Sequence, residues 1–233
     1  MQWKEIDTGV ASAEENMRLD GSMLETVQQP ILHFYEWERP SITYGHFIEP
    51  SKFLNLSSTE QKGIDCARRP TGGGIVFHLW DLAFSVLVPA QSNFFSLNTL
   101  DNYAFVNQAV LRAVQKFLGE KKDLSLTPQD LAAVRDVCKR FCMAQPTKYD
   151  VVLQGRKIAG AAQRKTRQGF LHQGTIALMM PEMDILKDVL CEREIAEAMM
   201  AHTYPLIGAR TLSEARQELK QFLRQEFINE NCD

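Results

Sequence analysis

The sequence predicts an α+β fold in which helices flank a mixed or antiparallel central sheet. Segments rich in β-branched and aromatic residues fill the centre of the chain, whereas helical periodicity dominates both ends. Such a segregated order of strands and helices is typical of α+β domains. The chain has 233 residues, of which 45% are hydrophobic, and this suits one sizeable domain or one large domain with a small appendage.

The N-terminal part combines one helix signal with two strand signals. Ser12 precedes Glu15 by three residues, as in a capping box, so a helix is expected over residues 12–24. The β-branched and aromatic composition of residues 31–37 and 41–44 predicts two strands.

The centre of the chain contains the most apolar segments. Residues 66–69 lead into a Pro-Thr-Gly-Gly-Gly turn, and residues 75–78 and 82–88 are expected to form buried strands. Apolar positions spaced by three and four residues predict a long helix over residues 100–117, and the polar residues 119–130 predict a loop.

The C-terminal half begins with a hairpin signal. A Gln-Gly pair at residues 154–155 separates two strand segments, residues 149–153 and 156–162. Residues 174–179 form another expected strand, and from Met183 onward the pattern becomes helical and charged.

Composition excludes several function classes. A formal net charge of -3 gives no basis for general nucleic-acid binding through phosphate neutralisation. The N-terminus has no apolar core of a signal peptide, and no stretch is apolar for the length of a membrane span, so no membrane partner is expected. An odd number of scattered cysteines, without a second Cys or His pair at metal spacing, predicts a reduced, cytoplasmic protein with no structural metal.

The segment RRPTGGGIVFH, residues 68–78, is the first candidate for a ligand site. Its consecutive glycines leave backbone N–H groups free to approach an anion such as a phosphate or a carboxylate. The two arginines add charge and bidentate donors. The segment matches neither the P-loop nor the GxGxxG pattern. A glycine-rich turn is often only a turn, but the flanking arginines and histidine favour a ligand site.

Lys157 is the second candidate, because it lies on an otherwise apolar strand directly after a turn. Lysine is seldom buried unless it is paired, so it would suit a point charge for a carbonyl oxygen or a phosphate. An equally weighted alternative is an edge-strand lysine that protects against aggregation. The small residues 160–162 leave room for a ligand tail, and Gly174 permits a close approach.

These segments resemble the lipoate–protein ligase A family, within the wider group of biotin and lipoate ligases and octanoyltransferases. The match includes WERPSITYGHF (residues 37–47), RRPTGGGIVFH, YDVVLQGRKIAGAAQR (residues 149–164) and FLHQGTIAL (residues 170–178), and it covers most of the chain. The resemblance implies a biotin/lipoate ligase-like catalytic domain over residues 1–233, without a large C-terminal accessory domain.

The resemblance also implies an enzyme that attaches a lipoyl or octanoyl group, in amide linkage, to a lysine of lipoyl carrier domains. Lys157 would hold the acyl carbonyl or an adenylate phosphate, and Asp150 matches an acidic position on the neighbouring strand. His172 is a candidate base whose neighbourhood favours a role in shaping its strand. The predicted substrate or acyl-adenylate site comprises Arg69, Gly72, Gly73, Gly74, His78, Asp150, Gly160, His172 and Gly174.

Two mechanisms fit this family, because a free carboxylate is a poor electrophile. A ligase would use ATP and Mg²⁺ to convert lipoate or octanoate into an acyl-adenylate. A transferase would take an octanoyl group from acyl carrier protein as a cysteine thioester and would need no cofactor. No protein ligand for the metal is evident from the sequence.

Cys142 is the candidate nucleophile of the second mechanism. The segment CMAQPTKYD, residues 142–150, resembles cysteine-dependent octanoyltransferases, in which the nucleophile precedes a Pro-Ser/Thr-x-Tyr-acid run. Ligases commonly carry Asn-Asp where this chain has Tyr-Asp, whereas Gly74 is ligase-like. A free cysteine is often an inert buried residue, so the two mechanisms remain about even. A reactive role requires thiolate character and access, for which Lys157 or a nearby arginine would supply charge.

The expected partners are lipoyl domains of 2-oxoacid dehydrogenase complexes or the glycine-cleavage carrier protein. An alternative from a different class is a catalytically inactive homologue that binds lipoate or a lipoyl domain. The combination of the glycine-rich turn with Lys157 argues against it. A biotin ligase is disfavoured because the GRGRxxR loop is absent.

Overall fold

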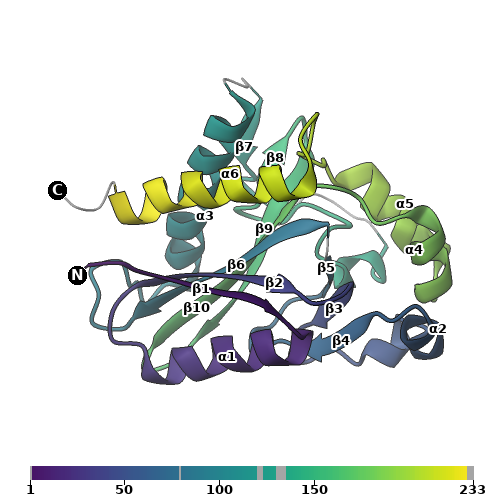
Figure 1. The fold of residues 1–233 in the computed structure, drawn as a ribbon, viewed down its shortest axis with the longest axis horizontal. Coiled ribbons are helices and arrows are strands. Elements are labelled where there is room, and N and C mark those ends of the chain that lie inside the picture. Colours follow the sequence, from purple (N-terminus) through teal and green to yellow (C-terminus); the bar gives the residue numbers. More distant parts are fainter. Residues whose placement is uncertain (1, 79, 120–122, 130–134, 230–233) are drawn as a thin grey trace.

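The computed structural model describes residues 2–78, 80–119, 123–129 and 135–229. These residues form two β-sheets and six α-helices (Figure 1). The strands are β1 Lys4–Ala11, β2 Ile31–Trp37, β3 Ser41–Tyr44, β4 Asp65–Arg68, β5 Ile75–His78, β6 Asp81–Pro89, β7 Leu124–Leu126, β8 Val151–Leu153, β9 Arg156–Lys165 and β10 Gly169–Ala177. The helices are α1 Ala13–Thr26, α2 Leu56–Gln61, α3 Thr99–Leu118, α4 Met183–Val189, α5 Arg193–His202 and α6 Leu212–Arg224.

The larger sheet has the strand order β1-β2-β6-β10-β9-β8-β7, and the smaller sheet has the order β4-β3-β5. Neighbouring strands of the larger sheet are antiparallel except for the parallel pair β1–β2. In the smaller sheet β3 is parallel to β4 and antiparallel to β5. This arrangement confirms the predicted α+β class and the mixed sheet.

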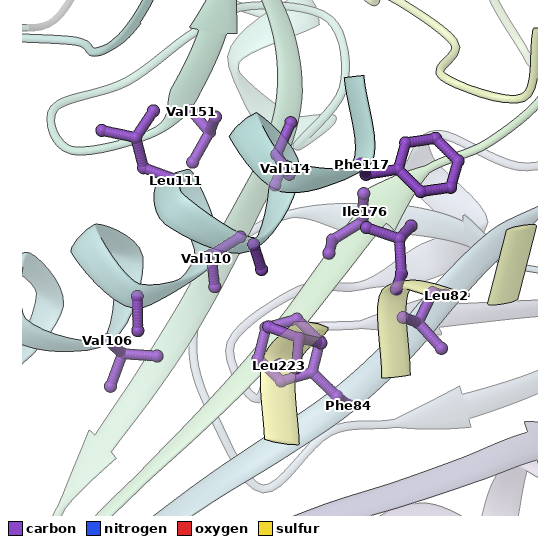
Figure 2. Close-up of a cluster of buried hydrophobic side chains, with 14 of the residues drawn as sticks. Leu82, Phe84, Val106, Val110, Leu111, Val114, Phe117, Val151, Ile176 and Leu223 are labelled. Atoms are coloured by element: carbon purple, nitrogen blue, oxygen red, sulfur yellow. The ribbon is translucent and has the colours of Figure 1, made fainter. Parts of the chain in front are cut away.

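The two faces of the seven-stranded sheet differ in chemistry because side chains alternate along each strand. Leu82 and Phe84 of β6 point into the main core, which α3 and α6 cover (Figure 2). Ser85, on the opposite face of β6, is fully buried and polar. We call the side that faces α3 and α6 the apolar face, and the side that faces α1 and the smaller sheet the polar face. Figure 1 shows α1 on one side of the sheet and α3 and α6 on the other.

Helix α1 begins with the predicted capping box. The Ser12 hydroxyl accepts a hydrogen bond from the Glu15 backbone, and the Glu15 carboxylate accepts one from the Ser12 backbone. This reciprocal pair satisfies N–H groups that a helix start leaves free. Met17 and Leu24 then bury their side chains against the polar face, which fixes α1 along the sheet.

Replacing Gly21 of α1 with alanine is expected to raise the free energy of unfolding by about 0.5–1 kcal/mol. A methyl group there would meet Pro70 at 3.7 Å, an ordinary contact, while the unfolded chain would lose conformational freedom. Urea denaturation measures the change. Gly63→Ala is the matched control with the opposite expected sign, because Gly63 has a φ of +65° and no atoms within 4 Å of the added methyl. A loss of stability in Gly21→Ala would contradict the prediction.

The sequence-based expectation did not include β1, α2 or β4, and it differs from the structure at β7 and β10. β1 lies at the sheet edge, and most of its residues are polar and half-exposed. Its register is also irregular between Asp7 and Val10, so its sequence lacks the apolar alternation that predicts a strand. The predicted loop over residues 119–130 is wrong at β7, a short edge strand that pairs with β8; residues 120–122 and 130 lie outside the described ranges. β10 begins five residues before the predicted start at Gly174 and pairs with β6 from Gly169.

None of the described helices combines the length and the apolar composition that a bilayer crossing requires.

Candidate active site

A pocket between the polar face of the larger sheet and the smaller sheet brings together residues that are distant in the sequence. It encloses about 400 Å³ of empty space, including its open mouth. Of the predicted residues, those that line it are Arg69, His78, Cys142, Lys157, Gly160 and Gly174. The two candidate catalytic side chains, Cys142 and Lys157, therefore face one cavity.

Lys157 reaches the pocket from the hairpin of β8 and β9. Gln154 and Gly155 both have positive φ angles, 52° and 74°, as a two-residue hairpin turn requires. β9 lies between β10 and β8, so Lys157 is not an edge residue, and only 3% of it is exposed. The edge-protection interpretation of Lys157 is therefore wrong.

Asp150 neutralises the buried lysine. Its Oδ2 lies 2.7 Å from Lys157 Nζ and accepts hydrogen bonds from the backbone and hydroxyl of Thr147, at 2.6 and 2.9 Å. Burial raises the pKa of the Asp150 carboxyl, and Lys157 and Thr147 only partly offset this. The arrangement holds one ammonium group at the pocket wall with its direction fixed.

The missing side chain of Gly160 makes this ion pair possible. A methyl group at Gly160 would lie 2.3 Å from Lys157 Cε, 2.5 Å from Lys157 Nζ and 2.7 Å from an oxygen of Asp150. The methyl group would meet the end of the Lys157 side chain and the Asp150 carboxylate, so relieving the overlap requires these paired groups to shift.

Gly160→Ala is expected to lower the free energy of unfolding by about 1–3 kcal/mol because it overpacks this buried pair. Thermal or urea denaturation measures the loss. Gly72→Ala serves as the control, since a methyl group there meets no atom within 4 Å and Gly72 has no positive φ. Equal stability of the two variants would show that the Lys157–Asp150 geometry is not rigid.

Cys142 lies in the segment that follows a short 3-10 turn, Cys138–Arg140. Its backbone N–H donates to the carbonyl of Ile75 at 3.0 Å, and Phe141 forms a parallel bridge with Ile75. These contacts attach the Cys142 segment to β5. Cys142 is partly exposed, whereas Cys138 is buried, so of these two thiols Cys142 is the accessible one.

Arg69 connects the glycine-rich turn with the pocket. Its Nη2 donates to the carbonyls of Gly72 and Gly74, at 3.2 and 2.7 Å, and its Nη1 donates to the hydroxyl of Thr43 at 2.8 Å. Burial lowers the pKa of the Arg69 guanidinium, and the interaction with Cys142 is the largest effect that opposes it. A cation is thus buried next to the candidate nucleophile.

The glycines shape the turn rather than line the pocket. Gly73 has a φ of +82°, and a methyl group at Gly74 would lie 2.2 Å from the carbonyl oxygen of Arg140. Only glycine permits this approach, and it brings the turn against the segment that carries Cys142. None of Gly72, Gly73 and Gly74 is among the described lining residues.

His78 forms a buried chain of hydrogen bonds behind the pocket. Its Nε2 lies 2.7 Å from the hydroxyl of Thr43, and its Nδ1 lies 2.6 Å from Oδ2 of Asp81. The imidazole also stacks on Trp37, with ring centroids 4.3 Å apart. Burial raises the pKa of Asp81, but His78 and a hydrogen bond from Thr175 outweigh this, so that pKa lies below its ordinary value.

His172 does not reach the pocket. Alternation along β10 places it on the apolar face, where it contacts Phe84 and Tyr103, while Gln173 and Thr175 line the pocket. Burial lowers the pKa of His172 to about 3, so the imidazole is neutral near pH 7. This position suits the strand-shaping role and not that of a base acting in the pocket.

Several neighbours of the site have no sequence signal of their own. Gln173 and Thr175 line the pocket, and Tyr103 of α3 interacts with Cys142, Asp150 and Arg69. Burial raises the pKa of Tyr103 to about 12. Period-2 alternation places Gln173 and Thr175 on one face of β10 and His172 and Gly174 on the other, but the sequence does not reveal which face the pocket adjoins.

The carboxylates beside the pocket do not form an evident magnesium site. Asp150 is paired with Lys157, and Asp81 is paired with His78. In the described part of the chain, no group of three or more His, Cys, Asp or Glu side chains is placed to hold a metal ion.

Comparisons with known proteins identify the family and the fold of the chain. Residues 12–229 match the model of the lipoyl protein ligase A/B catalytic domain, which confirms the resemblance. The octanoyltransferase LipM of Lysinibacillus sphaericus is 29% identical over 209 residues, covering 87% of this chain and 75% of that protein. The LipM of Bacillus subtilis is 27% identical over 233 residues, covering 94% and 84%.

The fold is also shared with a solved structure. The bipartite lipoate protein ligase of Thermoplasma acidophilum superposes with a TM-score of 0.72 at 24% identity, covering 97% of this chain and 84% of that one. This likeness confirms the predicted ligase-like fold.

Proposed function

Because the chain belongs to the lipoyl protein ligase A/B catalytic-domain family of acyl-transfer enzymes, we propose that it is an octanoyltransferase that works through a thioester on Cys142. The observation that carries the proposal is the position of Cys142. Its partly exposed thiol shares one pocket with the buried cations Lys157 and Arg69. The relatives named octanoyltransferase LipM support the same choice.

In the first half-reaction the Cys142 thiolate attacks the carbonyl carbon of an octanoyl thioester on acyl carrier protein. A C–S bond to Cys142 forms, the C–S bond to the carrier breaks, and the carrier leaves as a thiolate that takes up a proton. The Arg69 guanidinium lines the same pocket and supplies a positive charge near the attacking sulfur. In this proposal the Lys157 ammonium donates a hydrogen bond to the carbonyl oxygen as negative charge develops there.

In the second half-reaction the neutral ε-amine of an acceptor lysine attacks the Cys142 thioester. The new C–N bond becomes the amide, the Cys142 sulfur leaves as a thiolate, and the amine's surplus proton passes to solvent or to that thiolate. The same Lys157 contact stabilises the oxyanion in both steps, so one pocket serves donor and acceptor in turn.

The acceptors that we propose are lipoyl domains of 2-oxoacid dehydrogenase complexes or the glycine-cleavage carrier protein. The lipoyl domain named with the Thermoplasma ligase supports this class of partner. We further propose that residues 1–233 act as one catalytic domain that needs no accessory domain. An assay that contains only this purified protein, the acyl donor and a lipoyl domain tests this proposal.

The test is intact-protein mass spectrometry of the enzyme and of a lipoyl domain. One reaction contains octanoyl–acyl carrier protein, and the other contains lipoate with Mg²⁺ and ATP. We expect octanoylation of the lipoyl domain only in the first reaction, and an enzyme adduct at Cys142 that hydroxylamine removes, as it removes thioesters.

Each other outcome identifies a different function. Modification only with lipoate, Mg²⁺ and ATP would make the protein a ligase and would refute the thioester proposal. No modification in either reaction, with binding of the lipoyl domain retained, would identify an inactive binding homologue.

A further inference from the structure

The glycine-rich turn is attached to the polar face of the sheet by one buried side chain of its own. Thr71 is fully buried although it lies next to partly exposed glycines. Its hydroxyl donates to Oε1 of Gln173 at 2.7 Å. Gln173 belongs to β10 and also lines the pocket that contains Cys142 and Lys157. The turn and the pocket wall are therefore joined through one amide group.

The other end of that amide is fixed by a buried carboxylate. Gln173 Nε2 donates to Oδ2 of Asp20 at 2.6 Å, and Asp20 has no exposed surface. The Ser85 hydroxyl donates to the same oxygen at 2.6 Å, and His33 Nδ1 lies 2.9 Å from Oδ1. Four elements, α1, β2, β6 and β10, thus converge on Gln173 or its carboxylate partner.

The donor and acceptor groups of Asp20, Gln173 and Thr71 allow their hydrogen bonds to run in only one donor-to-acceptor order. An ionised carboxylate only accepts hydrogen bonds, so Asp20 requires the NH₂ end of the Gln173 amide. The amide oxygen then faces the turn and can only accept, which makes a hydroxyl donor at residue 71 the complementary group. Buried polar groups are costly unless every partner is present, so removing one member leaves the next unsatisfied.

We propose that Asp20, Gln173 and Thr71 form a positioning relay that holds the glycine-rich turn at the distance from the pocket that Cys142 acylation requires. The proposal rests on the proposed function. None of the three residues reacts; the relay acts through the turn, which Arg69 and the Cys142 segment contact directly. Gln173 is the relay residue that also lines the pocket, and through it a change in the relay reaches the wall beside Cys142 and Lys157.

The test compares Thr71→Val, which removes the hydroxyl and keeps the branched shape, with Thr71→Ser, which keeps the hydroxyl. Rapid quenching and intact-protein mass spectrometry give the rate of Cys142 thioester formation at saturating octanoyl–acyl carrier protein. We expect roughly a tenfold or greater decrease in Thr71→Val, because Gln173 Oε1 loses the hydrogen bond that the Thr71 hydroxyl donates, and a rate near wild type in Thr71→Ser.

Thr59→Val is the matched control for a purely structural effect. Thr59 is also a buried threonine. Its hydroxyl donates to the carbonyl of Asn55, the N-cap residue of α2, at 2.8 Å, and neither residue lines the pocket. Its removal should lower the melting temperature without changing the acylation rate. Equal rates in Thr71→Val and wild type would overturn the relay.

Gln173→Met supplies a second variant and closes a double-mutant cycle with Thr71→Val. If the two residues act as one unit, the double variant acylates no more slowly than the slower single variant. Independent, multiplicative losses would refute the relay even if each single variant is impaired. Failure of the wild-type protein to acylate Cys142 would instead refute the proposed function, so the two failures are distinguishable.

Discussion

Replacing Lys157 with alanine is expected to reduce acyl transfer to a lipoyl domain by at least ~100-fold, whether the donor is a thioester or an adenylate. Both routes develop negative charge on the same acyl oxygen, and the Lys157 ammonium is the buried donor fixed beside the pocket by Asp150. Initial rates of lipoyl-domain modification, measured by mass spectrometry, give the effect. Near-normal turnover would show that the site lies elsewhere.

The same substitution also changes stability, and a second variant separates the two effects. Without Lys157 the Asp150 carboxyl stays buried and uncompensated, which costs about 3–5 kcal/mol. Burial already raises its pKa above 3.8. A raised carboxyl pKa means tighter proton binding in the folded state, so the variant should lose stability as the pH rises above 3.8 and through the folded pKa.

The double variant Lys157→Ala/Asp150→Asn removes that buried charge. We expect it to regain most of the lost unfolding free energy and to remain inactive, because the ammonium donor is still missing. Lys165→Ala is the control on the same strand, since Lys165 is exposed at the end of β9. Recovery of activity in the double variant would show that Lys157 only neutralises Asp150.

Replacing Cys142 with serine is expected to abolish the enzyme adduct and to slow transfer from octanoyl–acyl carrier protein by roughly 1000-fold. A serine hydroxyl is a weak nucleophile unless a base activates it. The base that the sequence predicted, His172, lies on the opposite face of the sheet and is neutral with a pKa of about 3. Mass spectrometry of reactions quenched at set times measures the octanoyl adduct of the enzyme for the first half-reaction and the octanoylated lipoyl domain for the second.

Cys191→Ser is the matched control for Cys142→Ser, because Cys191 is an exposed free thiol outside the pocket. It should leave both the adduct and the rate unchanged. Both cysteine variants should unfold at the wild-type temperature, since oxygen replaces sulfur at positions that are not fully buried. Undiminished transfer in Cys142→Ser would eliminate the thioester route and favour a ligase.

Short sequence patterns correctly predicted the elements in which backbone conformation or burial restricts the choice of residue. Positive φ angles at residues 154–155 match the Gln-Gly hairpin signal, and the Ser12–Glu15 pair forms the predicted capping box. Apolar runs predicted β6 because it is buried on both faces. The edge strands β1 and β7 were missed, since exposure on one side removes the selection for apolar residues that reveals a strand.

The site was partly predictable for a related reason. Lysine in an apolar strand indicated Lys157, and motif resemblance indicated Cys142, and the structure brings both to one pocket. The face of His172 could not be assigned, because Gln173 and Gly174 beside it are also buried and the burial pattern carries no period. The hydrogen bond of Asp20 to Gln173 and the ring contact of Tyr103 with His172 join distant elements, which one sequence does not encode locally.

The contrast between the two faces of the larger sheet has a consequence for how new acyl specificities can arise. Substitutions at Tyr35 of β2 and at Gln173 and Thr175 of β10 alter the pocket, whereas Phe34 of β2 and Ile176 of β10 belong to the main core. A mutational library confined to alternate positions of these strands would therefore sample cavity shapes on a constant folding scaffold. Natural sequence variation can follow the same route, because substitutions on the pocket side of a strand do not require compensating substitutions on its core side.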